Sequence, residues 1–274
     1  MTYVVERIDW DSSFLGYPVG MLELCSGFET GKLKETLSQY RSQFRLIFVA
    51  LEEQGPETLP TPDAPCVCYD RKVVFKKTIT APPRPVDPHV QAYTSPICTK
   101  QMEQLAIKSG RYSRFKKDPE LSPQYERLFL TWINNSVCNG LSDSIWTWRD
   151  KSKILGLMTL RYAKRVNLRS GQWEREARVG MLGVHDEYRR QGIGTALLNV
   201  CDFWCDSLNI PVASLITQVD NEATCGLCLK QGYKQVAEES VYHYWSPFWS
   251  YHPHRGWEYR PPVPAGANET AGPA

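Results

Sequence analysis

The chain has 274 residues, of which 42% are hydrophobic and 23% are charged, a composition typical of soluble globular proteins. Its formal net charge of +2 gives no electrostatic reason to expect nucleic acid or an anionic membrane as a partner. The longest dense apolar run, residues 46–51, is much shorter than the ~20 residues of a membrane-spanning helix. Because the first residues also lack the charged-then-apolar order of a signal peptide, we expect a cytoplasmic protein.

Residues 1–80 are expected to form a small α/β domain without a catalytic constellation. Short apolar or alternating segments predict strands at 4–8, 19–24, 45–51 and 73–79, and helical spacing predicts a helix at 31–44. The next segment has four prolines between residues 81 and 88, which neither a helix nor a central strand accommodates. Residues 81–89 are therefore the predicted linker.

Residues 90–246 are expected to form a second, larger domain. The expected order is a strand at 90–94, helices at 99–108 and 122–137, strands at 144–149, 154–162 and 177–184, a helix from about 193, a strand at 211–218, a helix at 221–231 and a strand at 234–245. A turn is expected at 166–172. Residues 260–274 have the composition of a disordered tail, and His252 and His254 before it are expected at the surface.

The nine cysteines are irregularly spaced and fall mostly in apolar patterns, which favours reduced core thiols over a disulfide framework. Cys225 and Cys228 form a CxxC pair, for which a zinc or redox role is an alternative. No second cysteine pair or histidine cluster completes a tetrahedral zinc site around them. We therefore expect no bound metal.

The strongest functional signal is the stretch at residues 181–198, which reads as a strand, a tight turn and a helix that opens on glycines. Without side chains at Gly192 and Gly194, successive backbone N–H groups can point into one space at a helix N-terminus, where a phosphate is favoured. The lysine of a Walker loop and the three glycines of a dinucleotide-binding loop are both missing. The alternative is a simple turn with two exposed arginines.

These residues resemble the acetyl-CoA pyrophosphate loop of the GNAT acetyltransferases. The family pattern is Gln or Arg, two residues, Gly, one residue, then Gly or Ala, and residues 189–194 meet it in full. The resemblance implies that the backbone of one strand lines the pantetheine arm and that the following loop and an asparagine bind the rest of the donor. The implied acetyl-CoA-binding residues are Leu182, Gly183, Val184, Arg189, Arg190, Gln191, Gly192, Ile193, Gly194, Thr195 and Asn221.

The order of elements from residue 90 to 245 is also the GNAT order. The expected fold is therefore α/β, a GNAT fold with a mixed central sheet flanked by helices, preceded by a smaller α/β domain. A second family signature, Asn followed by Leu-Tyr and Gly-Phe, is met by Asn221, Leu227, Gly232 and Tyr233. The departure is Cys228, which stands where the family has its tyrosine. The implied function is acetyl-CoA-dependent transfer of an acetyl group to a primary amine.

Two residues are candidates for catalysis. Cys228 could protonate the leaving thiolate, since an ordinary thiol pKa of ~8.5 suits that task, or it could be a buried helix residue. Tyr233, Tyr242 and Tyr244 are alternative hydroxyl donors. Glu176 shares the alternation of Leu182 along one strand and could act as the amine's base, or it could be a solvated charge at the start of the strand.

The acceptor is expected to be a small-molecule amine. Short segments around residues 9–16, 113–119 and 132–136 resemble the dTDP-fucosamine N-acetyltransferases of the GNAT family, which implies a nucleotide-linked (dTDP) amino-deoxy sugar. Arg111, Arg114 and Asp118 would then bind its diphosphate and sugar, the alternative being a basic surface loop. Another small amine, a protein N-terminus, and a CoA-binding protein with weak catalysis stay open, as does a homodimer.

Overall fold

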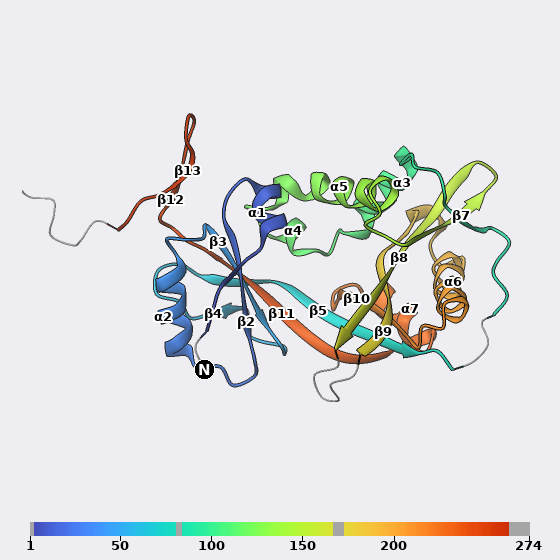
Figure 1. Ribbon diagram of the computed structural model, residues 1–274, viewed down its shortest axis with the longest axis horizontal. Coiled ribbons are helices and arrows are strands. Elements are labelled where there is room, and N and C mark those ends of the chain that lie inside the picture. The colour runs from blue at the N-terminus through green and yellow to red at the C-terminus, as the bar shows by residue number, and fades with distance from the viewer. Residues whose placement is uncertain (1–2, 81–83, 167–172, 263–274) are drawn as a thin grey trace, which may run out of the picture. The chain divides into compact units, whose positions relative to one another are not determined.

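A computed structural model describes residues 3–80, 84–166 and 173–262 and divides them into two compact units (Figure 1). Unit 1 combines the chain up to residue 69 with the chain from residue 239 on, and unit 2 comprises residues 70–238. The chain passes between the units twice, within strand β5 (Cys66–Thr78) and within strand β11 (Lys234–Trp245). The fold is the expected mixed α/β type, with sheets flanked by helices.

Unit 1 is built on strands β1 (Glu6–Arg7), β2 (Val19–Leu24), β3 (Leu46–Leu51) and the last residues of β11. Strand β2 pairs with β3 in parallel, and β3 pairs antiparallel with residues 240–245 of β11. Helix α2 (Thr30–Tyr40) buries Leu33 and Leu37 in the core of this unit. Helix α1 (Asp9–Leu15), which the sequence analysis missed, ends on Gly16 in the left-handed region.

A C-terminal hairpin completes unit 1. Strand β4 (Thr58–Leu59) pairs with the start of β5. The hairpin itself consists of strands β12 (Trp249–His252) and β13 (Gly256–Tyr259), which pair with each other. The hairpin packs through cation–π contacts, because the Arg45 guanidinium lies 3.4 Å from the centre of the Trp257 ring and 4.5 Å from that of Tyr17. The indole of Trp249 donates to the Arg41 carbonyl at 2.9 Å.

Unit 2 contains a six-stranded run in the order β5-β10-β9-β8-β7-β6. Its remaining strands are β6 (Val90–Ala92), β7 (Ser144–Asp150), β8 (Lys153–Val166), β9 (Trp173–Val184) and β10 (Val212–Gln218). Its helices are α3 (Lys100–Ser109), α4 (Arg114–Lys117), α5 (Tyr125–Cys138), α6 (Ile193–Ser207) and α7 (Glu222–Lys230), with short 3-10 turns at Ser122–Gln124 and Asp186–Tyr188.

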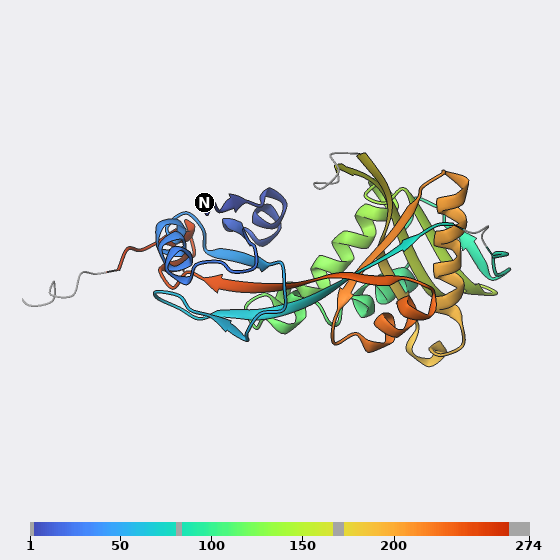
Figure 2. The ribbon, with the colours of Figure 1, turned by 90° about the horizontal axis from the view of Figure 1, so that it is seen from below.

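The helices of unit 2 cover both faces of the sheet (Figure 2). On one face, the α3 carbonyl of Leu105 lies against the backbone of Gly183 in β9. On the other, Leu197 and Leu198 of α6 join a buried cluster that includes Val179 of β9. The described part of the chain contains no helix that is both long and apolar enough to cross a membrane.

The unit boundaries differ from the domain boundaries expected from the sequence. Residues 72–78 of β5 pair antiparallel with residues 212–218 of β10, and Val73 and Phe75 are buried in the core of unit 2. The last strand of the expected domain 1–80 is thus part of unit 2, and the end of the expected domain 90–246 is part of unit 1. Residues 81–83 of the expected linker, 167–172 of the expected turn and 263–274 of the expected tail lie outside the described residues.

Candidate active site

A cavity of about 470 Å³ in unit 2 brings together the end of α3, the end of β9, the start of α6 and one face of α7. All but one of the predicted donor-binding residues line it, together with one of the three predicted acceptor residues. They are Leu182, Gly183, Val184, Arg189, Arg190, Gly192, Ile193, Gly194, Thr195, Asn221 and Arg111. Gln191 is exposed beside this cavity and is not among its lining residues.

The glycine-rich loop adopts the conformation that its sequence requires. Gly192 has φ +87°, in the left-handed region that favours glycine, and a Cβ there would meet nothing within 4 Å. Helix α6 starts at the next residue, and its first backbone bond runs from Ala196 N to Gly192 O at 2.9 Å. The earlier N–H groups of a helix have no partner within it, so they are available to an anion in the cavity.

Strand β9 separates from β10 beside the cavity. Within the described strands, residues 176–179 of β9 pair in parallel with residues 212–215 of β10, and the pairing ends at Val179 and Leu215. On its other edge, β9 carries a bulge, because Gly180 and Met181 together oppose Thr159 of β8. The Met181 N–H donates to Thr159 Oγ1 at 2.9 Å. The β10-facing backbone groups of residues 180–184 are therefore placed to bind a ligand between the strands.

The bulge overturns the alternation inferred for Glu176. Leu160 pairs with Val179 and Met158 with Leu182, so Val179 and Leu182 lie on the same face of β9 although three residues separate them. Glu176 consequently lies on the opposite face from Leu182. It is 3% exposed, its Oε2 is 3.8 Å from the Arg178 guanidinium, and six residues of strand put it about 20 Å from Leu182. The structure does not bring Glu176 to the cavity, and its role as base stays a prediction.

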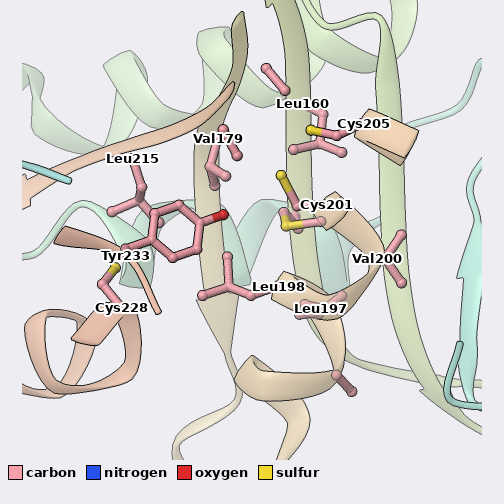
Figure 3. Close-up of a cluster of buried hydrophobic side chains, with 14 of the residues drawn as sticks. Leu160, Val179, Leu197, Leu198, Val200, Cys201, Cys205, Leu215, Cys228 and Tyr233 are labelled. Atoms are coloured by element: carbon pink, nitrogen blue, oxygen red, sulfur yellow. The ribbon is translucent and has the colours of Figure 1, made fainter. Parts of the chain in front are cut away.

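Cys228 lies in the core of unit 2 rather than in the cavity. Residues 222–224, 226, 227 and 230 of α7 line the cavity, and Cys228 does not. Its thiol lies among buried side chains beside Tyr233 and Leu215 (Figure 3). Burial raises the pKa of Cys228 to about 12. A leaving thiolate whose thiol has the ordinary pKa of ~8.5 is a much weaker base than the thiolate of Cys228. Proton transfer from Cys228 to the leaving thiolate is therefore unfavourable. These observations favour the packing alternative for Cys228.

The tyrosines considered as alternative acids are also buried. The hydroxyl of Tyr233 points toward Cys201 in the same apolar cluster (Figure 3), and the side chain is 2% exposed. Tyr242 and Tyr244 belong to the core of unit 1. None of the three lines the cavity.

Of the predicted acceptor residues, only Arg111 lines the cavity. The Arg114 guanidinium lies 3.9 Å from the buried carboxylate of Asp70 on β5. Asp118 is 1% exposed, and its Oδ1 accepts a hydrogen bond from Glu120 N at 2.9 Å, a bond typical of an Asx turn. Arg114 and Asp118 thus fix the connection that carries Arg111.

An acidic residue that was not predicted from the sequence organises the cations of the cavity. The Asp186 carboxylate lies 2.6 Å from Arg189, 2.8 Å from Lys108 and 3.8 Å from Arg111. The hydrogen bond from Lys108 and the nearby arginine charges hold the pKa of Asp186 below its usual value. The only sequence signal was its position three residues before Arg189.

The cavity is electropositive. Its lining includes the cations Lys108, Arg111, Arg189, Arg190 and Lys230, and the single acid Glu222. Asp186 beside the lining pairs with three of these cations, so five cations face two acids. This positive excess at the N-terminus of a helix favours a ligand that carries several negative charges.

Residues 103–233 match the model of the acetyltransferase (GNAT) family. Over these residues the chain is similar to the GNAT acetyltransferases. Members of the family are N-acyltransferases and generally use acetyl-CoA as the acyl donor. The matched segment contains every residue that lines the cavity.

Three solved structures illustrate the structural similarity. A functionally unknown conserved protein from Staphylococcus epidermidis is 10% identical with a TM-score of 0.51, covering 83% of this chain and 84% of that one. A GCN5-related N-acetyltransferase from Sphaerobacter thermophilus is 13% identical with a TM-score of 0.48, covering 82% and 73%. A GCN5-related N-acetyltransferase from Kribbella flavida is 12% identical with a TM-score of 0.44, covering 84% and 81%. The comparison with curated proteins gives no match.

Proposed function

We propose that the chain is an acetyl-CoA-dependent N-acetyltransferase whose donor binds in the cavity of unit 2. The observation that carries this proposal is the meeting of the open glycine loop, the N-terminus of α6 and the separated edge of β9 in one electropositive cavity. A pyrophosphate requires the first two features, and an extended thioester arm requires the third. The family match supports the same donor.

Each part of the cavity has a role in this proposal. The amides of residues 190–195 bind the pyrophosphate, and Arg189, Arg190 and Lys230 neutralise the donor's phosphates. The backbone N–H groups of residues 182 and 184, which face the gap beside β10, bind the pantetheine arm and polarise the thioester carbonyl, as hydrogen-bond donors do for a developing oxyanion. Acetyl-CoA supplies the acyl group and a thiolate leaving group that departs without an acid from Cys228.

The acceptor in this proposal is a primary amine, and the amino group of a nucleotide-linked (dTDP) amino-deoxy sugar is its leading candidate. The segments that resemble dTDP-fucosamine N-acetyltransferases support that candidate, and so does the presence of Arg111 in the cavity. The other candidates are a different small amine and a protein N-terminus. A CoA-binding protein with weak catalysis is the remaining alternative, since the family tyrosine is missing at Cys228.

A thiol-release assay separates these alternatives. The purified full-length protein is given acetyl-CoA and, in turn, a dTDP-amino sugar, free amino sugars, polyamines and short peptides. The proposal predicts release with primary amines, with the dTDP-amino sugar having the highest kcat/KM. Release that is highest with peptides would replace the sugar by a protein N-terminus. CoA binding without release on any amine would leave only the binding function.

A further inference from the structure

One face of the strands β5, β10 and β9 is turned away from α6 and presents its side chains in cross-strand rows. Ala213 and Leu215 of β10 point into the core with α6, so Ser214 and Ile216 point to the opposite face. Gly183 and Thr159 lie on this same opposite face, since Gly183 lies against Leu105 of α3. The face therefore borders the gap between β9 and β10 on the side away from α6.

Three cations form one of these rows. The pairing registers align Lys76 with Ser214, Ser214 with Arg178, and Arg178 with Arg161, across β5, β10, β9 and β8. At about 4.8 Å per strand, the row spans about 14 Å. Arg161 and Arg178 are both exposed. Like charges directly opposite each other destabilise a sheet, so the pairing of Arg178 with Arg161 is unfavourable in itself.

The next row is apolar and leads to the gap between the strands. Val74 pairs with Ile216, which is 57% exposed, and Gly180 is the first residue of β9 past the last β9–β10 pair. A Cβ on Gly180 would lie 4.0 Å from the Trp132 ring of α5. Two residues of strand, about 7 Å, separate Gly180 from Leu182, which lines the donor cavity. The apolar row therefore ends about two residues of strand from the donor cavity.

We propose that this face binds the acceptor and that the row of Lys76, Arg178 and Arg161 selects acceptors that carry a phosphate group. This inference rests on the proposed function for the position of the thioester. The Glu176 carboxylate offsets part of the charge, at 3.8 Å from Arg178, and leaves the row with a net positive charge. The apolar row then lies under the part of the acceptor between its phosphate and its amine.

The test compares two amines that differ only in a phosphate. Glucosamine 1-phosphate and glucosamine are titrated calorimetrically into the full-length protein, saturated with CoA so that the donor's phosphate site is filled. The variants are Arg178→Gln and Lys76→Gln, the second leaving the contact between Arg178 and Glu176 intact. Lys100→Gln is the matched control, an exposed lysine at the start of α3, where a positive charge is not stabilising.

We expect the phosphate-bearing amine to bind on the order of tenfold more tightly than glucosamine, and each row variant to abolish most of that preference. Glucosamine affinity and the Lys100→Gln control should stay within twofold. Equal affinities for the two amines, or a preference that survives both row variants, would overturn the inference. If thiol release proceeds with amines that lack a phosphate, and its rate is the same in both variants as in the wild type, the proposed function stands and this inference fails. If CoA does not bind, the proposed function fails, and the same titrations without CoA still decide the phosphate preference.

Discussion

The substitution Cys228→Ala tests the departure from the family pattern. The side chain is fully buried in the core of unit 2, so removing its sulfur should cost stability through a small cavity, on the order of 1–2 kcal/mol. For a domain of this size that corresponds to a fall in Tm of about 2–8 °C. Turnover per folded molecule should hold, because the thiol does not line the cavity and burial raises its pKa to about 12.

The companion substitution Cys228→Tyr restores the family's residue at a site with no room for it. A phenol ring in this filled cluster should overpack the core by about 1–3 kcal/mol or more, rather than raise the rate. Urea titration followed by circular dichroism gives the stability of both variants, and thiol release at saturating acetyl-CoA gives kcat. A hundredfold loss of kcat in an alanine variant with normal stability would refute the packing account.

Two further predictions follow from the burial of thiols and from the strand pairing. Burial raises the pKa of Cys228 to about 12, against ~8.5 for a thiol in the unfolded chain. The stability that depends on the neutral thiol is therefore fully present below pH ~8.5 and is lost as pH rises toward 12, with a loss of about 2.7 kcal/mol at pH 10.5. Urea midpoints at pH 8 and 10.5 should show this fall in the wild type and less of it in Cys228→Ala. A chain that begins at Val86 should fail to fold, because it lacks β5 and with it the partner of residues 212–218 of β10; a cooperative thermal transition in that shortened chain would contradict the assignment of β5 to unit 2.

The grouping of the candidate donor-site residues was predictable from the sequence because its signals are local. The spacing of Gly192 and Gly194 and the apolar periodicity of the following helix both operate within a few residues, and the structure brings those residues to one cavity. Asn221 was likewise predictable as the residue at which a helix begins. Its side chain accepts from Thr224 N at the N-terminus of α7, the contact that N-cap residues make.

The strand face of Glu176 and the burial of Cys228 depend on contacts with other strands and helices, which the local sequence does not show. The bulge opposite Thr159 shifts the register of β9 against β8 by one residue, which reverses the face inferred for Glu176 relative to Leu182. The pairing of β5 with β10 joins segments far apart in the chain, so the boundary at residue 80 could not be corrected locally. The burial of Cys228 likewise depends on which side of α7 meets the core.

The most direct test of the central claim is a calorimetric measurement of CoA affinity in the variant Gly192→Val. Gly192 and Gly140 have φ values of +87° and +68°, and a Cβ on either would meet nothing within 4 Å. Valine at both positions therefore imposes the same kind of backbone strain, but only Gly192 lines the cavity, since Gly140 is exposed after α5. The account predicts that Gly192→Val raises the Kd for CoA at least tenfold while Gly140→Val stays within twofold of the wild type. A wild-type Kd in a folded Gly192→Val variant would show that the loop is not the donor site.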